Sequence, residues 1–522
     1  MNRVDDRDRA AHSARARAPR QSRVGHSRQG LGGGEPATVA IIGGGCAGTL
    51  VAANLLRGAG GPLRITLIER GASFGPGVAY STQDAGHLLN VPAARMSAFA
   101  EQPLHFAEWA AQRLGRDAPE EFLPRRLYGE YLESVLERSR IEASPGRTLE
   151  LVHGEVRGLR RCGARIELAL AEGAAIRCDR AVLATGPLAG DPPLELPDDE
   201  RIIRDPLVAG ALRPAAPGGL ALVVGTGLTG VDAMLSLSAR GGRVAAISRA
   251  GCLPQTHLPG LRDPAPPPLV PRGSLSLAAV ERLLTDHFRE MASIGYDWRD
   301  AIDGLRPVTA QLWSALATRH RRRFLHARRR AWETRRHRMA PSIGRRLGEL
   351  RGAGMLETMA GELLDVRAEP AALRVTLAVG GSRTLRELSC ERLVLCTGPG
   401  LDIRAVADPL LCSLLSEGLA STDPLGLGLR TGADGALRDH AGRAGGEILT
   451  LGALRRGELW ETTAVDPIRV QARSVAEAIE GSLERRGRLR PAVPASSADG
   501  SALDQTTGLF AMSTPKPTEV EQ

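Results

Sequence analysis

Two glycine-rich turns, at residues 43–48 and 225–230, constrain this chain of 522 residues more than any other feature. Each turn follows a short apolar run and precedes a stretch that carries apolar residues at helical spacing. This strand-turn-helix context is typical of the dinucleotide-binding β-α-β unit. One such cluster would be weak evidence in a chain with 61 glycines, because glycines also form ordinary tight turns. Two clusters in matching context predict two nucleotide sites.

The first unit begins with the apolar run of residues 37–42, which is typical of a parallel strand buried on both faces. Gly43 permits the sharp turn, Gly45 lets a pyrophosphate approach the backbone, and Gly48 lets helix and strand pack closely. Glu69 ends the second strand, where a carboxylate accepts hydrogen bonds from ribose hydroxyls and repels a 2′-phosphate. The first site is therefore expected to hold FAD or NAD rather than NADP.

The second unit repeats this arrangement with Gly225, Gly227 and Gly230, but its second strand is followed by Ser248 and Arg249 instead of an acid. A hydroxyl and a guanidinium suit a 2′-phosphate, so we predict that this site prefers NADPH, with NADH as the other possibility. Alternatively, Arg249 is one more arginine among the 67 of the chain, with no special role. A first nucleotide site with a carboxylate at the end of its second strand, followed by a site for NADPH, is the arrangement of a flavoprotein that binds both FAD and NAD(P)H.

A nine-residue pattern of acid, arginine, apolar strand and Thr-Gly-Pro occurs twice, at residues 179–187 and 391–399. We interpret each copy as a place where the chain crosses between two nucleotide domains, with Thr185 and Gly186 beside the first cofactor. The alternative is that a strand followed by Gly-Pro is simply a common way to end a strand.

The sequence therefore predicts an α/β protein with two Rossmann-like dinucleotide-binding domains, for FAD and NAD(P), and a helical insertion in the second domain. Five segments are expected: a disordered arginine-rich extension (1–36), the first part of the FAD domain (37–215), the NAD(P) domain (216–384) with an insertion at about 258–350, the second part of the FAD domain (385–486), and a disordered tail (487–522).

The net charge of +9 resembles that of a nucleic-acid-binding protein, but the charge is unevenly distributed. Residues 1–30 contribute +5 and residues 319–346 contribute +11, so the remaining chain has a net charge of −7. With only 3% aromatic residues there are few stacking platforms, and we expect no nucleic-acid partner. The basic run at residues 335–338 is expected to bind an anionic substrate or an NADPH phosphate, or else to form a solvated helix face.

Other protein classes are disfavoured by what the sequence lacks. The seven cysteines include no Cys-x-x-Cys pair and no histidine grouping, so we expect no metal site, no disulfide framework and no flavin disulfide reductase. No apolar run reaches the roughly 18–20 residues of a membrane span, and the first 36 residues lack the apolar centre of a signal peptide. A cytoplasmic protein without a membrane partner is the expectation, with an arginine-rich transit peptide as the alternative interpretation.

Residues 74–97 follow Glu69 and are too interrupted by glycine to predict a helix. This segment lies where the chain would leave the ribose and pass the flavin ring. A hydroxylating flavin needs water exclusion and a hydrogen-bonding group near N5, so Tyr80, His87 and Asn90 are the catalytic candidates. Alternatively, each of these side chains only stabilises the loop.

The chain resembles the family that contains FAD-dependent urate hydroxylases and aspartate N-monooxygenases. The resemblance runs from about residue 38 to 480 and is carried by the motifs FGPGVAYST (74–82), HLLNVP (87–92), FLPRR (122–126), YGEY (128–131), GTGLTG (225–230) and WETTA (460–464). It implies further FAD contacts at Arg70, Val156 and Gly452. Relatives of this wider fold often carry Gly-Asp at the C-terminal flavin contact, where the aspartate binds the ribityl chain. Here Gly452 is followed by Ala453, so backbone groups would hold the FAD instead.

A helix that begins after this turn would direct its positive end toward the flavin pyrimidine, and Asp466-Pro467 suits the N-cap and the first helical position. The resemblance implies an enzyme reduced by NAD(P)H that hydroxylates a small nitrogen-containing substrate with molecular oxygen through a flavin hydroperoxide. Urate, a purine, ranks first as substrate on chain length, and the amino group of an amino acid such as aspartate ranks second. The hypothesis from another class is a non-catalytic FAD/NAD(P)-binding sensor or structural protein. The oligomeric state is left open.

Overall fold

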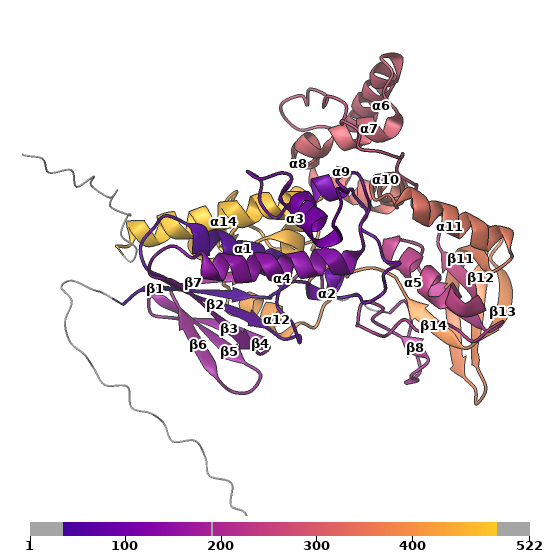
Figure 1. The fold of residues 1–522 in the computed structure, drawn as a ribbon, viewed down its shortest axis with the longest axis horizontal. Coiled ribbons are helices and arrows are strands. Elements are labelled where there is room, and N and C mark those ends of the chain that lie inside the picture. Colours follow the sequence, from indigo (N-terminus) through magenta and orange to yellow (C-terminus); the bar gives the residue numbers. More distant parts are fainter. Residues whose placement is uncertain (1–34, 189, 191, 488–522) are drawn as a thin grey trace, which may run out of the picture.

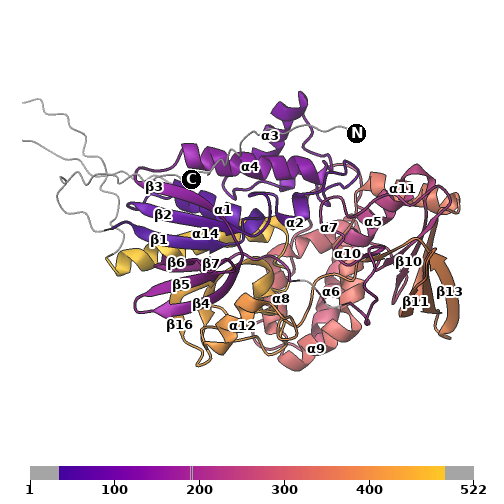
Figure 2. The ribbon, with the colours of Figure 1, turned by 90° about the horizontal axis from the view of Figure 1, so that it is seen from below.

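The computed structural model describes residues 35–188, 190 and 192–487, so most of the expected extension and tail lie outside the described residues. Two α/β domains lie side by side, and a group of helices projects from the second (Figure 1). Seen from below, this group lies between the two domains (Figure 2). The predicted fold class is confirmed.

The first domain is built on a six-stranded sheet in the order β15-β16-β7-β1-β2-β3, with all neighbours parallel except β15 and β16. Its strands are β1 (Ala37–Ile42), β2 (Leu63–Glu69), β3 (Arg147–His153), β7 (Arg180–Leu183), β15 (Ala436–Arg438) and β16 (Ala444–Thr450). The predicted strand-turn-helix order of the first unit agrees with β1, α1 (Cys46–Arg57) and β2.

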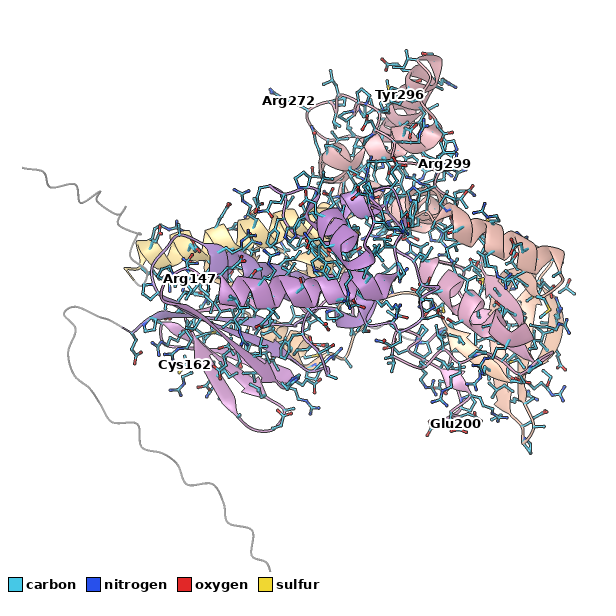
Figure 3. All side chains as sticks on the ribbon, viewed as in Figure 1. Arg147, Cys162, Glu200, Arg272, Tyr296 and Arg299 are labelled. Atoms are coloured by element: carbon cyan, nitrogen blue, oxygen red, sulfur yellow. The ribbon has the colours of Figure 1, made fainter. Side chains whose placement is uncertain are left out.

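Two hydrophobic cores lie on the two faces of this sheet. One core joins the sheet to α1, α4 (Arg125–Ile141) and α14 (Val465–Arg485); the other joins it to the antiparallel sheet β4 (Val156–Cys162), β5 (Arg165–Leu170) and β6 (Ala175–Cys178) and to α12 (Pro409–Ser416). Arg147 (Figure 3) has a fully buried side chain, and its Nη1 lies 2.5 Å from Glu480 Oε1 of α14. The last helix is thereby tied to the sheet formed by the first part of the chain.

The second domain contains a seven-stranded sheet in the order β13-β12-β11-β10-β9-β14-β8, in which β12 runs antiparallel to both of its neighbours, β11 and β13. Its elements are β8 (Ile202–Ile203), β9 (Leu220–Val224), α5 (Leu228–Ser238), β10 (Arg243–Ser248), α11 (Pro341–Gly352), β11 (Leu356–Ala368), β12 (Leu373–Val379), β13 (Thr384–Cys390) and β14 (Arg392–Leu395). The second glycine turn joins β9 to α5, as the sequence predicts.

The helical insertion lies between β10 and β11, and Tyr296 and Arg299 mark it in Figure 3. The Trp313 ring stacks on Trp460 of the first domain at 4.8 Å, and Trp313 Nε1 donates a hydrogen bond to Gly457 O at 2.8 Å. The insertion, which lies within the chain of the second domain, therefore also contacts the first domain. Its helices ahead of α11 are α6 (Leu277–Ser293), α7 (Trp298–Gly304), α8 (Thr309–Ala315), α9 (Thr318–Ala327) and α10 (Arg329–Arg336), and a 3₁₀ turn, η3 (Arg306–Val308), separates α7 from α8.

The strand pairing moves the expected domain boundaries. β8 lies before residue 216, β13 begins at residue 384 and continues beyond it, and β14 follows, yet all three belong to the second sheet. Propensity along the chain does not show which sheet a short strand joins, since that choice is made by distant pairing partners. The chain crosses between the sheets after β7 and after β14, which agrees with the interpretation of the repeated Thr-Gly-Pro pattern.

Two local expectations were wrong. The segment after Glu69 contains one short helix, α2 (Gly77–Tyr80), and the 3₁₀ turn η1 (Ala93–Arg95). Helix α14 is capped by Ala464, so Asp466 lies inside its first turn instead of at the N-cap. There the Asp466 carboxylate accepts a hydrogen bond from Arg469 Nη2 at 2.5 Å. Its negative charge still interacts favourably with the positive N-terminal end of the helix dipole.

We predict that Gly48→Ala destabilises the first domain by at least about 2 kcal/mol, because a Cβ at this position would overlap the carbonyl oxygen of Gly43. Gly348→Ala is the matched control, since Gly348 lies inside α11 and a Cβ there meets open space. Alanine in an exposed helix interior should instead stabilise by about 0.5–1 kcal/mol. Thermal unfolding of the purified variants measures both changes, and equal melting temperatures would contradict the role assigned to Gly48.

Candidate functional site

The two glycine turns have equivalent surroundings. Gly43 has a φ of +104° and Gly225 a φ of +108°, a region that favours glycine. A Cβ would overlap the carbonyl oxygen of Ala184 at the first position and that of Cys396 at the second. These carbonyls directly follow β7 and β14. Each glycine turn therefore contacts the chain at the point where it leaves its domain.

The helices that follow the turns begin without a side-chain cap. The N-cap of α1 is Gly45 and that of α5 is Gly227, and neither supplies a side-chain hydrogen bond. Uncapped first-turn N–H groups and the positive end of the helix dipole form a phosphate site. A Cβ at Gly227 would meet open space, and one at Gly230 would overlap the Gly225 carbonyl, as the predicted roles require.

The surroundings of the first turn fit an adenine dinucleotide. Glu69 ends β2, and its carboxylate accepts hydrogen bonds from Gly44 N and Gly71 N, both at 2.7 Å. The Thr185 hydroxyl beside Gly43 is buried without a hydrogen-bond partner among the described residues, which a bound ligand would supply. Gly186 follows with a φ of +73°.

Three further FAD contacts implied by the resemblance receive different surroundings. Arg70 is exposed, with Nη1 4.0 Å from Glu155 Oε1. Val156 begins β4 and packs into the core beneath the sheet. The Gly452 N–H donates to Gln471 Oε1 at 3.1 Å and is therefore already used within the protein. FAD binding by Arg70 and Val156 stays a prediction, and a Gly452 contact would have to use a group other than this N–H.

A cavity of about 2410 Å³ lies between the two domains and the insertion. Its wall includes the second glycine turn, Tyr80 and Asn90 from the first domain, and residues 463–467 at the start of α14. Elements from all three parts of the molecule thus face one space, and a second dinucleotide and a substrate could meet there.

The Ser248 hydroxyl is used within the protein. Its side chain is buried, shares a hydrogen bond of 2.7 Å with Thr226 Oγ1, and accepts one from Gly251 N at 3.1 Å. Because the Thr226 hydroxyl donates to Cys252 O, the Ser248 proton points to Thr226 and is not available to a phosphate. Ser248 lines the cavity, but its hydroxyl fixes the loop after β10, and this arrangement does not favour the predicted contact with a phosphate.

Arg249, in contrast, is exposed and lines the cavity. Arg330 of α10 also lines it, and its pKa is lowered by burial and, to a smaller degree, by the nearby charge of Arg249. Nothing in the sequence distinguishes Arg330 from the other arginines of the run at residues 319–346, so it was not among the predicted site residues. Two guanidinium groups from different elements flank the end of β10.

We predict that Arg249→Glu raises the KM for NADPH by about 10- to 100-fold, the range of one lost charge-assisted contact, and leaves the KM for NADH nearly unchanged. Ser248→Ala should alter both KM values by the same factor, because Ser248 shapes the loop without contacting the phosphate. Steady-state oxidation of the two coenzymes measures this. An equal rise in the KM values for NADPH and NADH in Arg249→Glu would contradict the assignment of Arg249 to the 2′-phosphate.

Of the three catalytic candidates, two line the cavity and one does not. Tyr80 and Asn90 line the cavity, and burial raises the pKa of Tyr80, which keeps the phenol protonated. His87 is buried, with Nδ1 2.8 Å from Thr82 Oγ1 and Nε2 2.8 Å from Ser236 Oγ of α5. Nδ1 is used within the first domain and Nε2 in a contact with the second domain, so His87 is not available to a flavin and the catalytic expectation is corrected.

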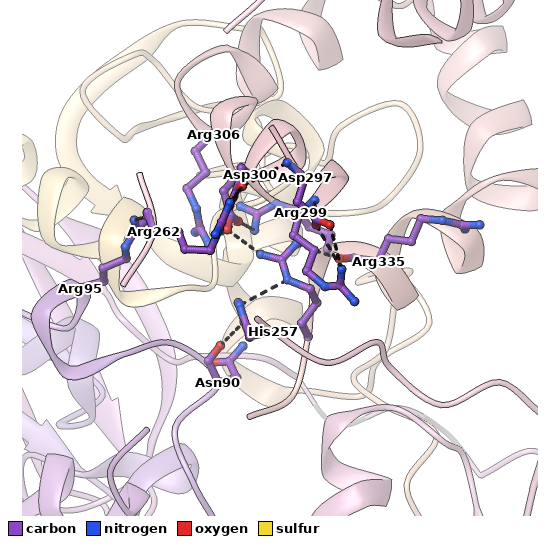
Figure 4. Close-up of polar contacts among 12 residues, drawn as sticks. Asn90, Arg95, His257, Arg262, Asp297, Arg299, Asp300, Arg306 and Arg335 are labelled. Atoms are coloured by element: carbon purple, nitrogen blue, oxygen red, sulfur yellow. Dashed lines mark hydrogen bonds and ion pairs between the residues drawn. The ribbon is translucent and has the colours of Figure 1, made fainter. Parts of the chain in front are cut away.

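Asn90 is held by a histidine that the sequence analysis did not consider (Figure 4). His257 Nε2 lies 2.9 Å from Asn90 O, and Arg338 Nε lies 3.4 Å from His257 Nδ1. Because arginine only donates, Nδ1 is the acceptor and Nε2 carries the proton. His257 lies 167 residues from Asn90 in a proline-rich loop, so no local pattern could have linked the two residues.

Burial, and next the charge of Arg338, lowers the pKa of His257 from 6.5 to about 4. As the pH falls below 6.5, the unfolded chain binds this proton before the folded protein does, so stability present above pH 6.5 is lost toward pH 4. We predict that His257→Gln removes about 2 kcal/mol of the stability decrease between pH 7 and pH 5. Chemical denaturation at the two pH values measures the difference, and parallel pH dependence of variant and parent would contradict it.

The basic run at residues 335–338 is not one solvated face. Arg336 and Arg338 are buried, with Arg338 Nη2 2.6 Å from Asp303 Oδ2, whereas Arg335 is exposed. All seven cysteines are free. Within residues 35–188, 190 and 192–487, no group of three His, Cys, Asp or Glu side chains could hold a metal ion. In the same described part, no helix has the length and apolar character needed to cross a membrane.

Residues 40–188 match the model of a protein family described as FAD-NAD(P)-binding, which confirms the resemblance of the first domain to flavoproteins. No curated protein matches the chain by sequence. Several solved structures share its fold with a TM-score of 0.55. L-lysine 6-monooxygenase of Pseudomonas syringae is 17% identical over 86% of this chain and all of its own.

Ornithine N-hydroxylase of Kutzneria sp. 744, with reduced FAD, NADP⁺ and L-ornithine, is 16% identical over 86% of this chain and 99% of its own. FAD-bound cadaverine monooxygenase of Erwinia amylovora is 15% identical over 91% of this chain and 99% of its own. At these identities the similarity establishes the shared fold.

Proposed function

We propose that the protein is an FAD-dependent monooxygenase that takes electrons from NAD(P)H and hydroxylates the amino group of a small metabolite with molecular oxygen. The observation that carries this proposal is the cavity of about 2410 Å³, onto which the second glycine turn, Tyr80 and Asn90, and the start of α14 all open. A nicotinamide held at the second turn and a flavin held by the first domain would face the same space.

The substrate class follows from the solved structures of this fold, whose names describe enzymes acting on ornithine, lysine and cadaverine. All three compounds carry primary amino groups. This reverses the order expected from the sequence, in which urate came first on chain length alone. An amino acid such as aspartate is now the first substrate to test, and urate the second.

When bound, FAD would supply the activation of oxygen, and the protein would provide binding, orientation and exclusion of water. The insertion covers the cavity, with Trp313 stacked on Trp460 at its edge. His257 fixes the backbone of Asn90, which directs this residue into the cavity. The start of α14 lines the cavity, and its positive end would favour negative charge on a flavin held there.

Disulfide reduction, another activity of two-dinucleotide flavoproteins, is disfavoured by the cysteines of this chain. Cys252 and Cys396 line the cavity, but both are free thiols. Burial raises the pKa of Cys396, which keeps it in the unreactive thiol form. A dithiol exchange centre would need two neighbouring cysteines, one of them a thiolate.

The proposal is tested with purified FAD-loaded protein by following oxygen uptake and hydroxylamine formation. We expect NADPH oxidation and oxygen uptake to accelerate with an amine substrate such as L-aspartate, and the product to contain a new N–O bond. If urate stimulates NADPH oxidation and a hydroxylated purine is the product, urate becomes the first candidate substrate again. A protein that binds FAD but neither oxidises NADPH nor consumes oxygen with any amine or purine would be the non-catalytic binding protein.

A further inference from the structure

One carboxylate in the wall of the cavity, that of Asp303, is shared by three arginines. Asp303 lies 2.6 Å from Arg338 Nη2, 3.3 Å from Arg306 Nη2 and 3.5 Å from Arg336 Nη1. Burial acts to raise the pKa of Asp303, but the three guanidinium groups outweigh it and hold the pKa below its usual value. Asp303 is therefore ionised and cannot fully compensate three cations.

The cluster has one uncompensated positive charge. A second carboxylate, Glu461, lies 2.9 Å from Arg336 Nε, so three guanidinium groups face two carboxylates. The neighbouring His257 does not change this count, because burial lowers its pKa to about 4 and keeps it neutral at pH 7. An uncompensated charge in a desolvated site is costly unless an anion binds beside it.

Arg306 and Arg336 each have a buried Nε without a hydrogen-bond partner among the described residues, but Arg336 Nε lies 2.9 Å from the Glu461 carboxylate, which leaves Arg306 as the member available to a ligand. Arg306 also lines the cavity. Burial, followed by the charge of Arg336, lowers the pKa of Arg306 to about 10, so it remains a cation at neutral pH. The Nε–H and a terminal N–H of arginine together match the two oxygens of a carboxylate.

The position of Arg306 separates it from the expected coenzyme phosphates. It lies on the turn η3 of the insertion, whereas the phosphate sites lie at the glycine turns and the 2′-phosphate site lies at the end of β10. The electrostatic neighbours of Arg306 include Asp466 in the first turn of α14, at the expected flavin end of the cavity. Asp466 is already paired with Arg469 and adds no net charge.

From this geometry, and resting on the proposed function, we propose that Arg306 binds a carboxylate of the amine substrate and selects anionic amines over diamines. A second ammonium group placed beside the cluster would be repelled by its excess positive charge. The chain would thereby differ in specificity from the cadaverine and lysine monooxygenases that share its fold.

The test uses Arg306→Gln in the FAD-loaded protein. Asp303 keeps Arg336 and Arg338 as partners in this variant, so the fold should survive. Arg335→Gln is the matched control, because Arg335 lines the same cavity but is exposed and donates to Ala331 O of its own helix. The probes are L-aspartate, L-asparagine and cadaverine, measured by calorimetric binding to the oxidised protein and by stimulated NADPH oxidation.

We expect the parent protein to bind L-aspartate more tightly than L-asparagine, and cadaverine most weakly. Arg306→Gln should weaken L-aspartate binding by about 10- to 100-fold, reduce the preference over L-asparagine, and leave the KM for NADPH unchanged. Arg335→Gln should bind L-aspartate within about twofold of the parent, and Arg306→Lys should recover part of the loss because it keeps the charge.

Several outcomes would overturn the inference: no binding of L-aspartate to the parent, tighter binding of cadaverine, equal losses in Arg306→Gln and Arg335→Gln, or a rise in the KM for NADPH in Arg306→Gln. The last result would assign the cluster to a coenzyme phosphate. Calorimetry requires no turnover, so failure of the proposed function would appear separately, as L-aspartate binding through Arg306 without stimulated NADPH oxidation or hydroxylamine formation.

Discussion

The architecture depends on the close contact between each glycine turn and the chain segment through which the polypeptide leaves that domain. Gly43 lies against the Ala184 carbonyl and Gly225 against the Cys396 carbonyl, in a backbone conformation that a side chain would prevent. These contacts fix the start of each nucleotide-binding helix and also the point at which the chain crosses to the other sheet. Because both crossings begin beside a glycine turn, dinucleotides bound at the two turns would be directed toward the junction of the domains.

The insertion turns this junction into a cavity with a defined chemistry. It contacts the first domain through stacked tryptophans and through Glu461, which lies 2.9 Å from Arg336 Nε and accepts a hydrogen bond from Trp332 Nε1 at 2.6 Å. Buried ion pairs add little net stability on average, but removing one partner leaves a costly buried charge. The network around Asp303 therefore fixes the position of the insertion and also sets the electrostatic character of the site.

The sequence predicted those parts of the fold that short-range patterns encode. The glycine turns, the flanking strands, Glu69 and the location of the insertion all follow from apolar periodicity and glycine spacing, and the structure agrees with them. Local sequence patterns do not reveal the role of a residue whose partner is distant in the chain. His87 and Ser248 have polar side chains in suitable segments, but each is used by a tertiary contact, to Ser236 and to Thr226.

The converse also holds for residues that the sequence analysis missed. His257 and Arg306 are positioned by contacts with Asn90, Arg338 and Asp303 that only folding creates. In a chain with 67 arginines, residue type alone could not distinguish a buried, partly unpartnered guanidinium from the exposed ones.

The central claim is that two dinucleotides meet in one cavity, and anaerobic mixing of the FAD-loaded protein with NADPH tests it most directly. If the nicotinamide reaches the flavin across the junction of the domains, the visible absorption of the oxidised flavin disappears in a single exponential phase whose rate saturates with NADPH concentration. A yellow protein that binds NADPH and keeps its colour without oxygen would show that the two sites do not communicate, which would contradict the account.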